Sequence, residues 1–241
     1  MREVRDGGEK LGLAAAHARA HLTSHISHLT SSIPVFIALF GATGRVGTRF
    51  LDYALADFHT IRALVRDPNK LAPRPGLEIV QGDVLDRAAV ARVVAGTDAV
   101  VSTLGGAGIE DPGEAQSHGV RNIVNAMSHH GVKRVLGVAG AGILDAPKGG
   151  LRHDQPGFPA KFKKVSDRHQ AAWEAMRDSG LEWTMLGLPD IVPGSRTGVY
   201  RVLDERLPEK ALKISVEDVA DLLLRELAQR EHVRKRLGAG Y

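Results

Sequence analysis

The hydrophobic residues of this chain follow two alternating patterns from residue 33 onward. Short, continuous apolar runs are typical of buried parallel strands, and they alternate with segments whose apolar residues recur every three or four positions, as on one face of a helix. The first apolar run covers residues 33–40 and ends in a glycine. Further strands are expected at residues 60–65, 77–81, 99–104, 134–139 and 183–186.

Helices are expected between these strands, at residues 45–57, 87–95, 114–130 and 165–179. Gly180 follows the fourth of these segments, and a glycine commonly ends a helix. A last helix, to about residue 230, is predicted to begin at Ser215, because Ser215-Val216-Glu217-Asp218 has the spacing of a capping box. The alternation of strand and helix predicts an α/β fold with a doubly wound parallel sheet, in one domain that covers residues 34–241.

Residues 1–33 differ from the rest of the chain and are expected to form a flexible N-terminal extension. They are rich in Ala, His, Ser and Thr, and they lack the central apolar stretch of a secretory signal. A start codon placed too early would explain the same composition. His17, His21, His25 and His28 would share one face of a helix, a spacing that can bind a metal. No other feature marks a metal site, and none is predicted.

A glycine-rich turn joins the first expected strand to the first expected helix. It reads Phe40-Gly41-Ala42-Thr43-Gly44-Arg45-Val46-Gly47. In a dinucleotide-binding turn the first glycine permits the tight bend, the second lets the backbone approach the phosphates, and the third lets the helix pack closely on the strand. N–H groups at the helix N-terminus then face the anion. Because the glycines follow an apolar strand and open an amphipathic helix, we predict a dinucleotide site here.

The end of the second strand distinguishes between the two nicotinamide dinucleotides. NAD-preferring sites place an acidic residue there for the ribose 2′-hydroxyl, whereas this chain has Arg66, 19 residues after Gly47. A guanidinium group suits a 2′-phosphate, so NADP(H) is the predicted cofactor. Asp67 weakens this signal, and Arg66 as an ordinary surface residue is the alternative. Asp83, just after the third strand, is expected to reach the adenine.

Together these segments resemble the atypical short-chain dehydrogenase/reductases, and within them the biliverdin-IXβ/flavin reductases and the NmrA-like proteins. The similarity extends from about residue 34 to the last helix. Besides the glycine turn it rests on Leu64-Val65-Arg66-Asp67, Gly82-Asp83-Val84-Leu85, Gly119-Val120-Arg121-Asn122-Ile123-Val124 and Ser179-Gly180-Leu181. It implies a single-domain, NAD(P)-binding Rossmann fold and NADPH-dependent reduction of flavins or linear tetrapyrroles.

The resemblance also assigns contacts to the cofactor. The pyrophosphate would be held by the turn, the 2′-phosphate by Arg66, and the adenine by Asp83 and Val84. Leu104 and Gly105 would lie beside the ribose, and Pro189 to Ile191 beside the nicotinamide. The turn residues concerned are Gly41, Thr43, Gly44, Arg45, Val46 and Gly47. Asp190 departs from the family, which tends to have histidine there.

The sequence also departs from the usual catalytic pattern. Most short-chain dehydrogenases use a Tyr with a Lys four residues on, but Tyr53 and Tyr200 are followed at that spacing by Asp57 and Asp204, and Tyr241 is the last residue. The serine that flavin reductases place near the substrate corresponds to Gly140. Hydride transfer to a flavin needs no such acid.

Few other side chains are candidates for a role in catalysis. His169 aligns with a histidine of the flavin reductases and is the candidate catalytic residue, with a structural, half-buried histidine as the alternative. Ser102 and Thr103 end the fourth strand, where a hydroxyl could meet the substrate or the ribose, or simply belong to the strand.

Composition and charge restrict the partners. With no cysteine, a reducing cytoplasm is the expected location, and no apolar run approaches the roughly 18 residues of a membrane span. Between Lys148 and Gln170, six basic residues face two acidic ones, which equals the net charge of +4 of the whole chain. This stretch is either a solvated surface or a mouth for an anionic substrate. Aromatic residues make up only 5%, so nucleic-acid binding is not expected.

Two functions remain open. The first is an NADPH-dependent reductase that transfers hydride to a flavin or a similar conjugated, anionic small molecule. The second is a non-catalytic NADP(H) sensor of the NmrA-like kind, which would act through a protein partner. A sugar-nucleotide epimerase is disfavoured because the Tyr/Lys pair is missing.

Overall fold

The computed structural model describes residues 33–106 and 108–241. The four histidines considered as a metal site, His17, His21, His25 and His28, lie outside the described residues.

The centre of the fold is an eight-stranded sheet in the order β3-β2-β1-β4-β5-β6-β10-β8. Its first seven strands are parallel, and β8 runs antiparallel to β10 at one edge. In chain order the strands are β1 (Phe36–Phe40), β2 (Thr60–Val65), β3 (Leu77–Gln81), β4 (Ala99–Ser102), β5 (Arg134–Gly140), β6 (Glu182–Leu188), β8 (Arg201–Asp204) and β10 (Lys235–Gly240). The predicted doubly wound parallel sheet is confirmed.

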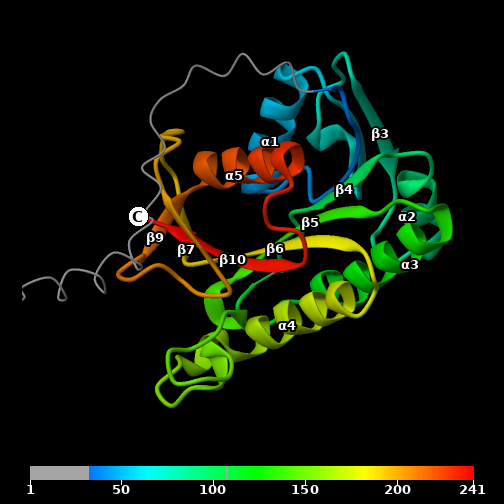
Figure 1. Cartoon of the computed structure of the whole chain (residues 1–241). Helices are drawn as coiled ribbons and strands as arrows, with labels where there is room; N and C mark the ends of the chain where they lie inside the picture. Colours follow the sequence, from blue (N-terminus) through cyan, green and yellow to red (C-terminus); the bar gives the residue numbers. More distant parts are fainter. Residues whose placement is uncertain (1–32, 107) are drawn as a thin grey trace, which may run out of the picture. The chain divides into compact units, whose positions relative to one another are not determined.

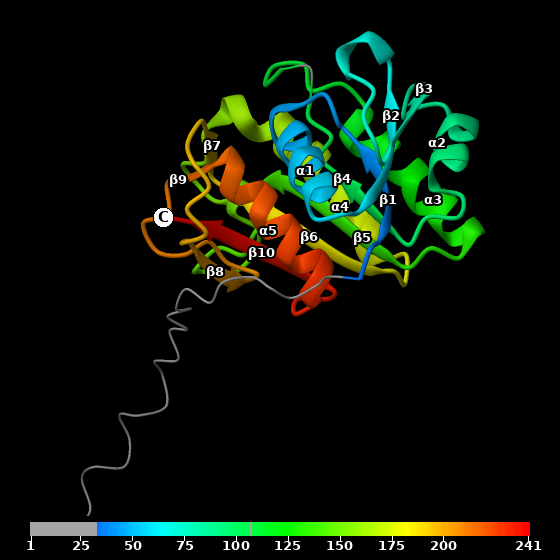
Figure 2. The ribbon, with the colours of Figure 1, turned by 90° about the horizontal axis from the view of Figure 1, so that it is seen from above.

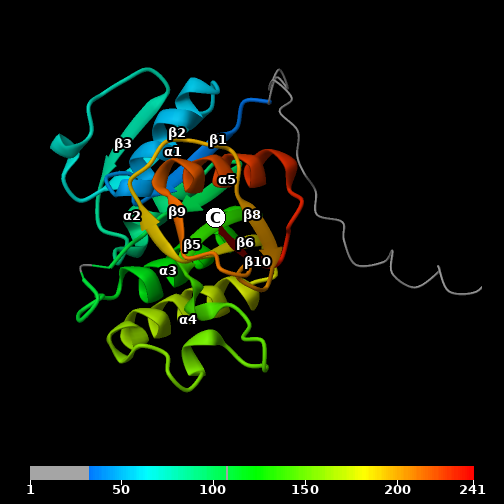
Figure 3. The ribbon, with the colours of Figure 1, turned by 90° about the vertical axis from the view of Figure 1, so that its left-hand side faces the viewer.

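Helices cover both faces of this sheet (Figure 1, Figure 3). Helices α1 (Arg45–Ala56) and α5 (Val216–Gln229) lie side by side on one face, and α2 (Arg87–Val94), α3 (Val120–His130) and α4 (Lys163–Arg177) lie on the other. Shorter helical turns occur at Pro68–Lys70, Ala115–Gly119, Ala141–Ile143, Arg152–Asp154 and Ala160–Phe162.

The core has two halves, one on each face of the sheet. Strand β1 shows why, because successive side chains of a strand point to opposite faces. Ile37 and Leu39 pack into the cluster under α1 and α5, whereas Ala38 and Phe40 pack into the cluster under α2, α3 and α4. All four side chains are buried, so β1 reads as a continuous apolar run rather than an alternating one.

The strand order reverses at β1, which pairs with β2 on one side and with β4 on the other. In open α/β sheets such a switch point forms a crevice at the carboxyl ends of the strands, and ligands bind there. The view in Figure 2 shows α1 and α5 in front of this central part of the sheet.

A small second sheet pairs β7 (Asp190–Val192) with β9 (Lys213–Ser215). The segment after β7 is fastened to α5 by Asp218, whose carboxylate accepts hydrogen bonds from the N–H of Thr197 (2.7 Å) and of Gly198 (2.9 Å). Burial alone would raise the pKa of Asp218, but its hydrogen bonds outweigh this effect and hold the pKa below its usual range. Ser215 caps α5 as predicted, accepting from the N–H of Asp218 at 3.0 Å.

Candidate functional site

The glycine turn between β1 and α1 has the geometry of a phosphate cradle. Gly41 has φ +90°, a conformation that side-chain-bearing residues rarely adopt, and its carbonyl accepts from the N–H of Gly44 at 2.9 Å. A Cβ on Gly47 would collide with that same carbonyl oxygen. Helix α1 therefore starts directly against the turn, with Gly44 as an N-cap that supplies no side-chain hydrogen bond.

The first N–H groups of α1 are left for a ligand. An α-helix gives no internal acceptor to its first N–H groups, and the first turn of α1 carries no acidic side chain. Thr43, Gly44 and Arg45 are exposed at this end, whereas Val46 and Gly47 are buried. Backbone donors at a helix N-terminus favour an anion, so the turn fits the diphosphate of a dinucleotide.

Thr103, just after β4, holds the turn in place. Its hydroxyl lies 3.1 Å from the carbonyl oxygen of Phe40 and 3.2 Å from that of Gly41, and its N–H also donates to Phe40. The side chain is buried. These bonds give Thr103 a structural role, in which it holds the glycine turn from the side of β4.

The side chain of Arg45 extends from the glycine turn to β7. Its Nη1 donates to the carbonyl oxygen of Ile191 in β7 at 3.0 Å. This bond joins the turn expected at the pyrophosphate to the segment expected at the nicotinamide. Pro189 and Ile191 are half-buried, and Asp190 between them is exposed.

The residues expected around the adenosine lie at the ends of β2 and β3. Arg66 directly follows β2 and is exposed, and among the described residues its guanidinium makes no ion pair. Asp67 caps the next helical turn by accepting from the N–H of Asn69 at 3.1 Å. Asp83 folds back to accept from the N–H of Leu85 at 2.9 Å. Val84 is buried against Gly119, where a Cβ would lie 2.7 Å from its Cγ1, so Val84 offers a ligand only its backbone.

His169 lies between the ends of β4 and β5. Its Nδ1 accepts from the N–H of Gly140 at 3.1 Å, and its Nε2 lies 2.6 Å from the amide of Gln116. Gln116 in turn donates to the carbonyl oxygen of Leu104 at 3.2 Å, and Gly105 next to it is exposed. Burial, with a smaller effect of His153, lowers the pKa of His169 to about 4. His169 is therefore neutral near pH 7 and holds two strand ends together.

Gln116 was not identified from the sequence. It lies in the Ala115–Gly119 turn, which has π-helical geometry, and the carbonyl of Glu114 accepts from the N–H groups of Ser117, His118 and Gly119. Single π turns inside helices frequently occur at functional sites. The sequence of this segment predicted an ordinary helix and carried no signal for the turn.

The three tyrosines are tied to carboxylates of α5. The hydroxyl of Tyr53 donates to Glu217, that of Tyr200 to Asp221 at 2.7 Å, and that of Tyr241 to Asp218 at 2.5 Å. Burial and the neighbouring carboxylate raise the pKa of Tyr53 to about 12, and the same causes raise the pKa of Tyr200 further. These hydroxyls are committed to the helix and are poor proton donors.

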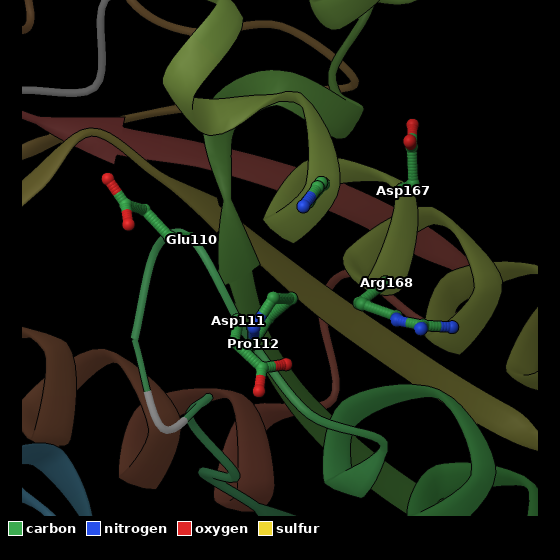
Figure 4. A pocket seen from close by; sticks show the side chains of 6 residues that line it. Glu110, Asp111, Pro112, Asp167 and Arg168 are labelled. Carbon is green, nitrogen blue, oxygen red and sulfur yellow. The ribbon is translucent and has the colours of Figure 1, made fainter.

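An open pocket of about 490 Å³ lies between the loop after β4 and the start of α4. Figure 4 shows Glu110, Asp111 and Pro112 on the loop, across from the end of α4 that carries Asp167 and Arg168. Lys164 completes the lining. The pocket therefore presents three carboxylates and two cations.

Two of the six basic residues between Lys148 and Gln170 are paired with carboxylates. Lys163 pairs with Asp154 at 2.9 Å and with Asp167 at 3.3 Å, and Arg168 pairs with Glu114 at 2.5 Å. The acidic partner of Arg168, Glu114, comes from the segment after β4, which is distant in sequence from the basic stretch, whereas Lys163 pairs within that stretch. Counting charges along residues 148–170 alone could not reveal this compensation.

The comparisons with known proteins agree with this geometry. The NAD(P)H-binding family matches residues 41–230, from the first glycine of the turn to the end of α5. This chain belongs to that family. The predicted NAD(P)-binding Rossmann fold is thereby confirmed.

Three solved structures illustrate the similarity. A protein of Burkholderia pseudomallei described as exported is 32% identical, with a TM-score of 0.75 over 86% of this chain and 100% of its own. A Streptococcus pneumoniae protein described as an NADH-flavin reductase is 22% identical, with a TM-score of 0.71 over 86% and 99%. The anaerobilin reductase of Escherichia coli O157:H7 is 22% identical, with a TM-score of 0.68 over 84% and 96%. At such identities the last two show the shared fold alone. Within the described part of this NAD(P)H-binding protein, no helix is both long and apolar enough to cross a membrane.

Proposed function

We propose that this NAD(P)H-binding protein is an NADPH-dependent reductase of a flavin or a similarly conjugated small molecule. The observation that carries the proposal is the glycine cradle at the open N-terminus of α1, combined with Arg66 at the end of β2. When bound there, NADPH supplies a hydride to the acceptor. The proteins described as flavin and anaerobilin reductases share this fold, which supports the choice of acceptor.

Different residues of the chain would bind and orient different parts of the cofactor. The N–H groups of α1 would hold the diphosphate, with Arg45 closing over it, and Arg66 would hold the 2′-phosphate. Asp83 and the backbone of Val84 would face the adenine, with Leu104 and Gly105 beside the ribose. Pro189 and Ile191 would flank the nicotinamide.

His169 would act as a positioning residue rather than as a proton donor. Its Nδ1 accepts from the N–H of Gly140, its Nε2 is enclosed against Gln116, and its low pKa keeps the ring neutral. It fixes the end of β5 through the N–H of Gly140, and Gln116, packed against its ring, donates to the carbonyl of Leu104. An acceptor ring that takes its protons from water needs no side-chain acid at this place, so binding and orientation are the contributions of the protein.

The first experiment mixes the purified protein with NADPH and FMN and follows the nicotinamide absorbance. Turnover is expected. Arg66→Ala should raise the Kd for NADPH roughly 10- to 100-fold, because one charge-assisted phosphate contact is lost, and should leave the Kd for NADH unchanged. Arg201→Ala, on the edge strand β8, removes the same charge far from β2 and serves as the control. Equal affinity for NADH and NADPH, with no effect of Arg66→Ala, would contradict the 2′-phosphate assignment.

A non-catalytic NADP(H) sensor is the second candidate. It is favoured by Gly140, which leaves no hydroxyl where the flavin reductases place a serine, and by the buried, neutral His169. Tight NADPH binding without turnover of any flavin would support the sensor, which would then be expected to bind a protein partner.

A further inference from the structure

The pocket beside α4 has charge features that bear on the class of acceptor. Its two cationic residues differ in how far their charge is compensated. Arg168 is neutralised by Glu114 at 2.5 Å, whereas Lys164 makes no ion pair within the described residues. The three carboxylates also differ in whether they are paired. Asp167 pairs with Lys163 at 3.3 Å, and Glu110 and Asp111 make no ion pair in the described part of the chain.

The uncompensated charges of the pocket are therefore two carboxylates and one ammonium group. Glu110 and Asp111 are both exposed on the loop after β4. The side chain of Asp111 accepts from the N–H of Gly113 at 3.3 Å, a contact that orders the loop without neutralising the charge. A phosphate entering this pocket would meet a slight excess of negative charge.

The remaining wall of the pocket is suited to an uncharged ring. Pro112 is the apolar residue of the lining, and Ile109, next to the lining on the same loop, is 45% exposed. Apolar surface of this kind gains free energy by covering a flat conjugated ring.

We propose that the acceptor carries no net negative charge in the part that occupies this pocket, so that riboflavin is preferred over its phosphorylated form, FMN. This inference rests on the proposed reductase function. The charge balance gives it a direction: a dianionic phosphate about 10 Å from one net negative charge in water should weaken binding about fourfold. Added salt should reduce the difference, because the Debye length falls below the separation.

The test measures flavin binding without turnover. The protein is saturated with NADP⁺, and riboflavin or FMN is titrated at low and high salt while the flavin fluorescence is followed. Riboflavin is expected to bind more tightly at low salt, and the difference should narrow at high salt. The double variant Glu110→Gln/Asp111→Asn changes the net charge by two units, so it should tighten FMN about 16-fold and leave riboflavin unchanged, because asparagine keeps an oxygen for the N–H of Gly113.

Two further variants complete the design. Lys164→Gln should weaken FMN and leave riboflavin unchanged. Glu231→Gln removes one exposed carboxylate after α5, outside the pocket lining, and should change neither affinity. Tighter binding of FMN than of riboflavin at low salt, with the preference abolished in Lys164→Gln, would overturn this inference. The proposed reductase function would not be affected by that result. Failure of both flavins to bind the NADP⁺ complex would refute the flavin assignment itself, and the inference with it.

Discussion

The buried histidine His169 makes the stability of the fold depend on pH in a direction that can be measured. Its ring is enclosed by α4, the end of β5 and Gln116, and burial lowers the pKa from the ordinary 6.5 to about 4. In the unfolded chain the same imidazole has its ordinary pKa. Between these two values the unfolded state binds a proton that the folded state does not bind, so acid favours unfolding.

The magnitude follows from the shift. A shift of two and a half pKa units corresponds to about 3 kcal/mol of unfolding free energy. This stabilisation is lost in full only below pH 4. The contribution is intact above pH 6.5, and the unfolding free energy should be about 2 kcal/mol lower at pH 5 than at pH 7 from this group alone. Other groups titrate in the same window, so the contribution has to be isolated by difference.

Urea unfolding of the wild type and of His169→Gln at pH 7, 6 and 5 isolates it. Glutamine cannot be protonated, so the stability gap between the two proteins should shrink by about 2 kcal/mol from pH 7 to pH 5. His129→Gln, an exposed change on α3, is the control. A gap that stays constant over this range, or widens in acid, would show that His169 is not the buried neutral group described above.

Three further predictions concern the cradle and the acceptor side. Gly47→Ala should cost about 3 kcal/mol or more by thermal melting and abolish NADPH binding, because its Cβ collides with the carbonyl of Gly41; Gly44→Ala, whose Cβ would lie 3.3 Å from that oxygen, should be far milder. Thr103→Val should cost about 1–2 kcal/mol in urea unfolding and weaken NADPH, whereas Thr103→Ser should behave as wild type. Gly140→Ser should fold normally, because its backbone is extended and a Cβ lies 3.4 Å from the histidine ring; it should alter the KM for the acceptor and leave the Kd for NADPH unchanged.

The central strands and helices could be predicted from the sequence because each carries its own signal. The strands 60–65 and 77–81 were predicted with the bounds that β2 and β3 have, because each is a short run centred on apolar residues. The turn at Gly41–Gly47 was equally clear. Its chemistry depends on backbone conformation, which glycine spacing encodes locally.

The C-terminal strands were missed because their sequences resemble loops. Strand β10 reads Lys-Arg-Leu-Gly-Ala-Gly, a composition typical of turns, yet it is almost wholly buried. Arg236 within it is stabilised by distant groups, the carboxylates of Glu205 and Asp145 and the carbonyl of Ile143. A strand whose polar group is paired across about 90 positions in sequence has no local pattern to reveal it.

The same reason applies at the site. The ion pair of Arg168 depends on Glu114 from the segment after β4, and the hydrogen bonds of Thr103 depend on where β1 ends beside it. Both depend on contacts between segments that are distant in sequence. The periodicity and composition of a single segment do not predict such contacts.

The π-helical turn at Ala115–Gly119 acts as a spacer of one residue in an otherwise regular helix. An α-helix advances about 100° per residue, so deleting one residue here would restore the regular period and rotate Gln116 away from both His169 and the carbonyl of Leu104. The loop that lines one wall of the pocket would then lose its tether to α4, although every strand and the glycine cradle stayed intact. Insertions and deletions in this family are therefore expected to alter the choice of acceptor at this turn before they alter the choice of cofactor.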